Sequence, residues 1–538
     1  MPNSASVLAV EIALFGACAY AAFCAYWVLV GNLAVLGRGW RWPVLAGLGA
    51  GILTFGCRLC LARGQVSWVP YLDQWNAEIS GIVSPLVHGG LDWRSLVAGN
   101  NEHRVLLTRV MSLDLMIFNG GWDNRVLVFG NYLLESAMVA WTCIFAWSLL
   151  GWARGSVVCA AALLPMFLVC DWEAIVSSNQ SQFVFMAFGT VVALSLTHSY
   201  SLGSTGARGA LAVALITLGS MASGMFTALA MAATALVFSH VRRRGLRSVA
   251  GFGAACLGLA AVGWLTRVHY TALNSIYAKG AQEWLAAFLA YAAWPLPANV
   301  LGFLGLWLPW AFLLFRTLRR REMELFAPFA IGMGIWALLQ AAALAWARAG
   351  LDGLVSSRYT EFMSWGTVAN AAALVLVLRC QGAGGRRIAS WALVAVWLGC
   401  VGGTEIWRSD AIYRPYMDGF REQTREHEQR LGTFMRTGDP EVIEGVGFPH
   451  IPYFSPDQII ATLRDAQVVA MLPAPLRRDG VRDRQPDAAA TVHDGPLSFV
   501  AIRAFVWGPG IAVLGGAMIL AAFLGARRRG GEAGFSRG

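Results

Sequence analysis

Apolar runs long enough to cross a lipid bilayer follow one another along almost the whole chain. A helix of about 20 apolar residues spans the hydrocarbon core of a membrane. The chain has 538 residues, of which 57% are hydrophobic and only 13% are charged. A soluble protein carries roughly twice that fraction of charge. The sequence therefore predicts an all-α integral membrane protein in which one membrane domain accounts for most of the residues.

The apolar runs predict about thirteen transmembrane helices. The first run lacks a basic leader and a clear small-residue cleavage site, so we interpret it as a retained helix. The expected helices lie at residues 6–36, 43–62, 123–150, 156–170, 183–199, 209–223, 225–240, 248–267, 296–316, 325–347, 364–379, 388–406 and 499–524.

The positions of the arginines predict how these helices are oriented. If the N-terminus is outside the cytoplasm, every short connection on the inner side is basic, as the positive-inside rule requires. The C-terminus is then cytoplasmic. Lys279 is the single lysine of the chain. Together with the richness in alanine and glycine, this favours a bacterium with a GC-rich genome, and hence location in its inner (plasma) membrane.

The connections between the apolar runs divide the chain into three predicted parts. Residues 1–406 form a transmembrane domain whose first outer loop covers residues 63–122. Residues 407–498 are rich in charge and proline, which predicts a small extracytoplasmic domain with helices at about 410–436 and 456–468. Residues 499–538 hold the last transmembrane helix and a basic cytoplasmic tail.

The first outer loop is predicted to contain two helices that lie on the membrane surface. The run 105–118 is too short to span a bilayer. Arg104, Thr108 and Ser112 are spaced at i, i+4 and i+8, which places them on one stripe of a helix. Such an amphipathic helix is typical of the membrane interface. The segment 76–88 is predicted to be a second helix of this kind.

Acids and arginines gather in the segments expected on the outer side. Carboxylates can act as general bases, and guanidinium groups bind phosphate. The chain has no Walker loop and no G-x-G-x-x-G after a strand, so an activated substrate would come from the membrane. It also lacks a basic patch interleaved with aromatic residues, so no nucleic-acid partner is expected. The candidate residues are Asp73, Glu102, His103, Arg104, Asp171, Glu173, Gln180, Gln182, Arg358 and Tyr359, together with Trp75 as a possible sugar-stacking ring.

The order of these elements resembles that of the GT-C membrane glycosyltransferases, such as the lipid A aminoarabinose transferases and protein O-mannosyltransferases. The resemblance is strongest over residues 65–200. Many relatives have two adjacent acids where this chain has Asp73-Gln74, and many lack a helix before the one that feeds the loop. The matching elements are Asp73-Gln74-Trp75, Gly90-Leu-Asp92-Trp93, the helix 104–118 and the turn Asn119-Gly-Gly121, together with the Asn-Glu-His-Arg motif at 101–104 and the Gln-x-Gln-Phe motif at 180–183 of a bacterial branch.

The resemblance implies an inverting transfer of sugar from a polyprenyl-phosphate carrier to a cell-envelope glycan, lipid or protein. Asp73 is the preferred base for the acceptor hydroxyl, with Glu102 or Asp171 as a second acid. Arg104 and Arg358 are the preferred ligands of the lipid phosphate. A divalent cation could sit between carboxylates, but the sequence does not demand one. Substrate-binding roles fall to Trp75, His103, Glu173, Gln180, Gln182 and Tyr359.

Structural interpretations of the same residues stay open. Asp73 could cap a helix, and residues 102–104 could clamp the loop. Glu135 lies inside a predicted span and is protonated, paired or lining a wet cavity, while Arg58 is expected to pair with Glu11. Two other functions are possible: a transporter or flippase of a lipid-linked saccharide, and a catalytically inactive relative that acts as an assembly partner.

Overall fold

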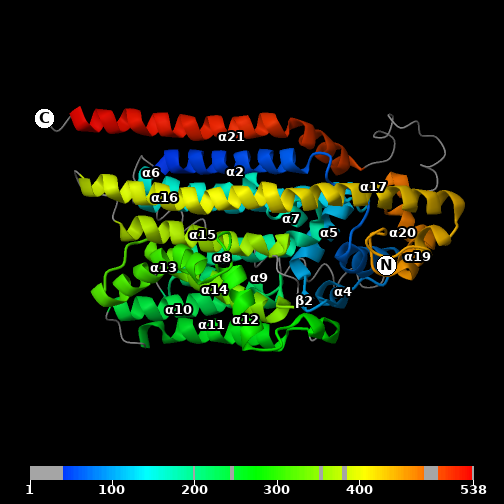
Figure 1. Ribbon diagram of the computed structural model, residues 1–538, viewed down its shortest axis with the longest axis horizontal. Coiled ribbons are helices and arrows are strands. Elements are labelled where there is room, and N and C mark those ends of the chain that lie inside the picture. Colours follow the sequence, from blue (N-terminus) through cyan, green and yellow to red (C-terminus); the bar gives the residue numbers. More distant parts are fainter. Residues whose placement is uncertain are drawn as a thin grey trace.

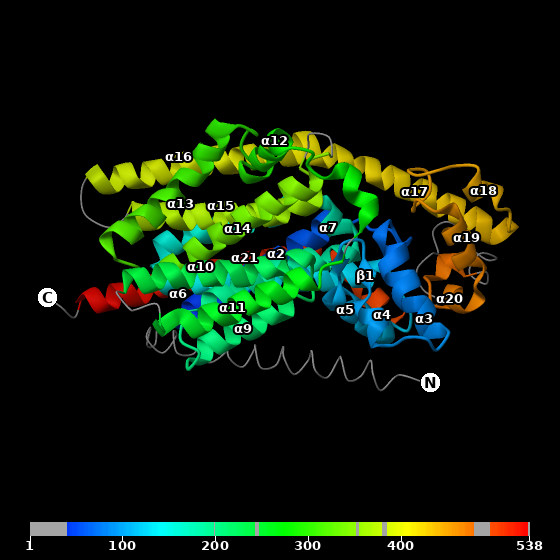
Figure 2. The ribbon, with the colours of Figure 1, turned by 90° about the horizontal axis from the view of Figure 1, so that it is seen from below.

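The computed structural model of the chain describes residues 40–197, 200–242, 247–268, 270–350, 355–378, 385–477 and 495–535. The expected first span, 6–36, lies outside the described residues. Long helices run side by side along the longest axis of the molecule, and shorter elements gather at one end of this bundle (Figures 1 and 2). The only strands in the described part of the chain are β1 (Gly99–Asn100) and β2 (His103–Arg104), which form a short hairpin.

Eight helical stretches among the described residues are long and apolar enough to cross a membrane. The prediction of an all-α protein with apolar, membrane-spanning helices is therefore supported, although eight is fewer than the thirteen expected. The stretches are Arg41–Ala62, Asn124–Phe167, Ala222–Val241, Val300–Arg320, Ala327–Arg348, Ser357–Val377, Gly385–Thr437 and Pro496–Ala526.

The difference in number has local causes. Helix α6 (Asn124–Leu163) covers two expected spans, which meet at a kink where Gly151 adopts a positive φ of 72° that glycine tolerates. Three other expected spans coincide with helices of moderate length: α8 (Ser181–Leu196), α9 (Thr205–Thr217) and α11 (Arg247–Leu265). A 16-residue helix such as α8 is only about 24 Å long, which is shorter than a typical hydrocarbon core.

The first and last described helices of the bundle pack closely against each other. Helix α2 (Arg41–Ala62) runs beside α21 (Pro496–Phe535), as Figure 1 shows in blue and red. A Cβ atom added at Gly56 would come within 2.3 Å of the Ala512 nitrogen, and one added at Gly515 would come within 2.3 Å of the Leu53 nitrogen. Small residues allow such close backbone contact between membrane helices.

Helix α15 (Ser357–Val377) is the most buried helix of the bundle. It packs against α6, α13 (Val300–Arg320) and α14 (Ala327–Arg348). The sequence predicted its start at residue 364, seven residues too late, because the polar residues Ser357 to Glu361 suggested a loop. The structure instead buries Ser357, Thr360 and Glu361 inside the protein, at the end of the bundle where the loops gather, and leaves Arg358 partly exposed.

The first loop, residues 63–122, contains both of the predicted helices. The π-helix η2 (Trp75–Val83) continues into α3 (Ser84–Val87), and α5 (Leu106–Asn119) matches the predicted run 105–118. Thr108 and Ser112 of α5 face the protein, and the Ser181 hydroxyl donates to the Thr108 hydroxyl over 2.7 Å. Ile117 and Phe118 are exposed, so α5 is amphipathic with Thr108 and Ser112 inward, whereas Arg104, expected on the same stripe, lies in β2 before the helix begins.

A small domain stands beyond the same end of the bundle; we call it the cap domain (residues 414–477). Helix α16 (Gly385–Arg408) leads without a break through η7 (Ser409–Tyr413) into α17 (Arg414–Thr437), so the predicted domain boundary at 406 falls within one continuous helical stretch. Helices α18 (Glu441–Glu444), α19 (Pro456–Arg464) and α20 (Ala466–Ala470) complete the domain. Leu431, Phe434 and Ile459 share a hydrophobic core with Trp75 and Ile79 of the first loop.

Candidate functional site

Four of the predicted site residues, Asp73, Glu173, Gln180 and Arg358, line one pocket at the loop end of the bundle. They come from three separate parts of the chain. Asp73 lies in the first loop, Arg358 begins α15, and the other two belong to α7 (Trp172–Val176) and η4 (Ser178–Gln180). The remaining lining residues are Tyr71, Leu72, Trp172, Val176, Ser177 and Asn179.

The backbone around Asp73 is held in an uncommon conformation. Leu72 has a φ of 45° and Asn101 a φ of 51°, and both values lie in the left-handed region that side chains other than glycine rarely adopt. The Leu72 backbone amide donates to the Pro452 carbonyl of the cap domain over 2.8 Å, and the Asn101 side-chain amide donates to Asp73 Oδ1 over 3.4 Å. Residues in such conformations cluster at functional sites when their surroundings enforce the strain.

Gln74 directly follows Asp73, and its contacts are structural. It is fully buried, and its amide nitrogen donates to Asn124 Oδ1 over 2.7 Å and to the Ser178 hydroxyl over 2.5 Å. The Ser178 hydroxyl in turn donates to Glu78 over 2.7 Å. Burial raises the pKa of Glu78 to about 7 despite these hydrogen bonds. This network fixes the Asp73 segment against η4, which carries Gln180.

Glu173 and Arg358 form an ion pair in the pocket wall. Arg358 Nη2 lies 2.7 Å from Glu173 Oε1, and the Ser357 hydroxyl donates to Glu173 Oε2 over 2.7 Å. Burial alone would raise the pKa of Glu173, but the Arg358 charge and the Ser357 hydrogen bond outweigh it and lower that pKa. The Arg358 side chain keeps 29% of its surface exposed. Because Arg358 also lines the pocket, its side chain is partly accessible there.

A second polar cluster adjoins the pocket at the β1–β2 hairpin. Arg348 Nη2 lies 2.5 Å from Glu102 Oε1, and Arg348 Nε donates to the Tyr359 hydroxyl over 2.9 Å. Burial lowers the pKa of His103 to about 4, although Glu102 opposes the shift, so this imidazole is neutral at pH 7. Sequence reasoning missed Arg348. Its position at the outer end of a predicted span, where the positive-inside rule disfavours arginine, was the available signal.

Asp171 belongs to a different environment from the pocket. Arg58 donates to both of its oxygens, with Nη1 at 2.9 Å from Oδ1, and Arg58 Nε lies 2.6 Å from Glu135. All three side chains are at most 4% exposed. Arg58 is thus paired with two acids of the bundle, whereas the expected partner Glu11 lies outside the described residues. The geometry gives Asp171 a structural role as an arginine partner.

Two further acids lie buried near this triad of Arg58, Glu135 and Asp171. Glu361 is 3% exposed, and neither of its carboxylate oxygens has a hydrogen-bond partner within the described ranges. Glu405 is 1% exposed, and its Oε1 likewise has no partner there. One guanidinium cannot balance four carboxylates, and burying an unpaired charge is costly. We therefore expect these two acids to hold protons.

Three other candidates lie outside the pocket lining. Arg104 donates to the backbone carbonyls of Thr266 and Val97, at 2.8 and 2.7 Å, which ties down the hairpin. Trp75 is fully buried, and its indole nitrogen donates to the Pro70 carbonyl, so its ring presents no face to a sugar. Gln182 is buried within α8.

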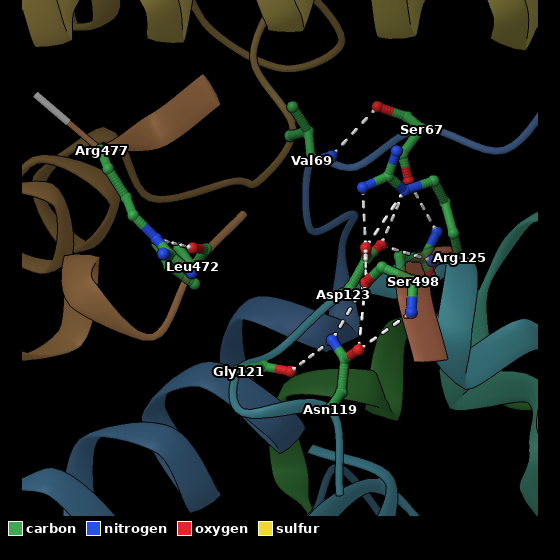
Figure 3. Close-up of polar contacts among 10 residues, drawn as sticks. Ser67, Val69, Asn119, Gly121, Asp123, Arg125, Leu472, Arg477 and Ser498 are labelled. Carbon is green, nitrogen blue, oxygen red and sulfur yellow. Dashed lines mark hydrogen bonds and ion pairs between the residues drawn. The ribbon is translucent and has the colours of Figure 1, made fainter. Parts of the chain in front are cut away.

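A polar joint connects the first loop, α6 and α21 (Figure 3). The Ser498 hydroxyl donates to Asp123 Oδ2 over 2.6 Å, and the Asn119 amide donates to the Ser498 hydroxyl over 3.0 Å. Arg125 pairs with the same Asp123 carboxylate at 2.7 Å. Arg477 of the cap domain donates to the Leu472 carbonyl and lines a hollow beside this joint. These bonds hold the start of the last helix against the start of α6.

The pocket thus places a partly buried carboxylate, Asp73, beside a paired but accessible guanidinium, Arg358. Among the described residues, no group of three or more His, Cys, Asp or Glu side chains is arranged to hold a metal ion. No protein-family model matches the chain, and no curated protein matches its sequence.

Proposed function

We propose that this protein is an inverting glycosyltransferase of the GT-C type that uses a sugar on a polyprenyl-phosphate carrier. Its acceptor is a cell-envelope glycan, lipid or protein at the outer face of a bacterial inner membrane. The proposal includes about thirteen spans, with the N-terminus outside and the C-terminus in the cytoplasm. The single observation that carries it is the pocket that Asp73 and Arg358 line together.

Asp73 is suited to act as the general base. Within the described ranges, its side-chain hydrogen-bond partner is the neutral side-chain amide of Asn101, so the carboxylate can accept another hydrogen bond. It would take the proton of the acceptor hydroxyl while that oxygen attacks the anomeric carbon. The bond between that carbon and the phosphate oxygen breaks on the opposite face, which inverts the configuration and releases polyprenyl phosphate.

Arg358 is suited to receive the negative charge that develops on the leaving phosphate. Arginine binds phosphate bidentately and stays charged at any physiological pH. Glu173 keeps the guanidinium oriented through a 2.7 Å contact. Gln180 and Asn179 line the same pocket and offer amide groups to sugar hydroxyls.

The neighbouring cluster would position these groups. Glu102 is engaged by Arg348 at 2.5 Å, so we assign it a role in orienting Arg348 rather than that of a second base. Tyr359 shares the same arginine. Neutral His103 can donate one hydrogen bond to a substrate. A divalent cation, if the reaction uses one, would find carboxylates at Asp73 and Glu173.

The test is the substitution Asp73→Asn, which keeps the size of the side chain and removes its basicity. Purified protein in detergent receives lipid-linked sugars and candidate envelope acceptors, and mass spectrometry follows the release of polyprenyl phosphate. We expect turnover to fall by about 10²–10⁴-fold. Asp457→Asn, at an exposed residue of α19, is the matched control and should turn over normally. Near-normal turnover by Asp73→Asn would exclude this residue as the base.

One observation favours the alternative of a lipid-linked saccharide transporter. Transporters place ionisable groups inside the bundle, and Glu135, Glu361 and Glu405 are buried there. In detergent, where no sidedness exists, a transporter leaves the donor intact. Movement of intact donor across liposomes, without acceptor-dependent cleavage in detergent, would support that alternative and contradict glycosyl transfer.

A further inference from the structure

Three aromatic side chains of the cap domain lie together, the exposed Phe448 and Phe454 and the partly buried Tyr453, and we call them the aromatic shelf. Phe454 is 67% exposed and Phe448 is 38% exposed. Their ring centroids lie 4.5 Å apart, and the Tyr453 ring lies 6.2 Å from that of Phe454. Large aromatic rings that gather on a surface mark a binding site more often than isolated ones do.

The shelf is fixed next to the candidate base. The carbonyl of Pro452, directly before Tyr453, accepts the Leu72 amide over 2.8 Å, and Leu72 precedes Asp73. A second bond joins Gln458 of α19 to the Ser80 hydroxyl of the first loop over 2.8 Å. Burial raises the pKa of Tyr453 most, and the charges of Asp73 and Tyr270 raise it further. The Tyr453 phenol therefore interacts electrostatically with Asp73.

The shelf and the groups suited to phosphate belong to different parts of the fold. Arg358 and Glu173 belong to the bundle, whereas the shelf belongs to the cap domain, which stands beyond the ends of the spanning helices (Figures 1 and 2). A lipid chain would follow the bundle into the hydrocarbon region. A ligand on the shelf is therefore held by the cap domain, away from the spanning helices that a lipid chain would follow.

We propose that the aromatic shelf binds a saccharide ring of the acceptor, so that the substrate is a glycan or the sugar headgroup of a glycolipid rather than an unmodified protein. A pyranose ring has an apolar C–H face that packs on an aromatic ring and an edge of hydroxyl groups. In this proposal the ring packs on Phe454 and presents its hydroxyl edge to Asp73. This inference rests on the proposed glycosyl transfer.

The test compares Phe454→Ala with Phe454→Trp in the purified full-length protein. Saturation-transfer NMR measures binding of a panel of neutral, amino and acidic oligosaccharides without any donor. We expect Phe454→Ala to weaken binding of at least one panel member by roughly three- to tenfold and Phe454→Trp to restore it. Tyr416→Ala removes another exposed aromatic ring, outside the shelf, and should change nothing.

Binding is measured in the Asp73→Asn background as well, because the shelf does not need the base in order to bind. If the Asp73→Asn variant binds the saccharide and also turns over normally, the proposed reaction is refuted and the shelf is retained. Absence of Phe454-dependent binding across the panel would overturn the shelf. In turnover assays, Phe454→Ala should raise KM for the acceptor alone. A raised KM for the donor would instead place the prenyl chain on the shelf and contradict the proposal.

Discussion

Replacing Arg58 by methionine tests whether the triad of Arg58, Glu135 and Asp171 is structural. Methionine keeps an unbranched chain but leaves two carboxylates without their partner. Arg58 is fully buried and engages three carboxylate oxygens. Breaking a buried ion pair by removing one partner costs about 3–5 kcal/mol. Domains of 150–250 residues lose about 2–4 °C in Tm per kcal/mol, and larger ones lose less, so we expect Tm to fall by about 5–10 °C.

Thermal unfolding of purified protein in detergent, followed by intrinsic fluorescence, measures this effect. Arg414→Met is the matched control, because Arg414 pairs with Asp410 on the surface, where both side chains are about half exposed and the pair contributes little. Adding Glu135→Leu and Asp171→Leu to Arg58→Met removes every charge of the triad and should recover most of the lost stability. An unchanged Tm for Arg58→Met, with a large loss of turnover, would show that the triad belongs to the chemistry.

Three other outcomes are expected. The pKa of His103 is about 4 in the folded protein and near 6.5 in the unfolded chain, so the unfolded chain binds more protons between these values and stability falls as pH is lowered through this window. Between pH 7 and pH 5, the Tm of His103→Gln should therefore fall less than that of the unsubstituted protein, and an equal fall would contradict the assignment. Gly56→Leu should separate α2 from α21 and lower Tm, whereas Gly510→Leu, with open space around it, should not; equal effects would count against close packing. Reporter fusions after residues 100 and 450 should report the outside and one after 320 the cytoplasm, and a cytoplasmic signal at 450 would reverse the proposed orientation.

The sequence predicted the helices well where a long apolar run is continuous. The runs 43–62 and 325–347 match α2 and α14 closely. Prediction failed where polar residues are buried by protein instead of lipid. Helix α15 begins at Ser357, where Glu173 accepts hydrogen bonds from the Ser357 hydroxyl and the Arg358 backbone amide, and this tertiary contact leaves no pattern in the local sequence.

The candidate site was predictable in composition but not in pairing. Asp73, Glu173 and Arg358 stood out as polar residues in connections between apolar runs, and they line one pocket. Asp171 stood out for the same reason, yet it turns away to Arg58, a residue 113 positions earlier in the chain. Two residues apart, Asp171 and Glu173 have different environments because one precedes and the other lies within the short helix α7.

The burial of Arg58 has a consequence for the biogenesis of the protein. Glu135 is synthesised 77 residues after Arg58, so helix α2 leaves the ribosome long before its acidic partners exist. An arginine at the centre of a membrane helix costs about 2.5–3.5 kcal/mol on insertion scales, and near a helix end it can reach the lipid headgroups. We therefore expect α2 to insert first with Arg58 at the lipid headgroups, and to take its final position only after α6 has been inserted. Helix α21, which packs on α2, would complete the assembly last.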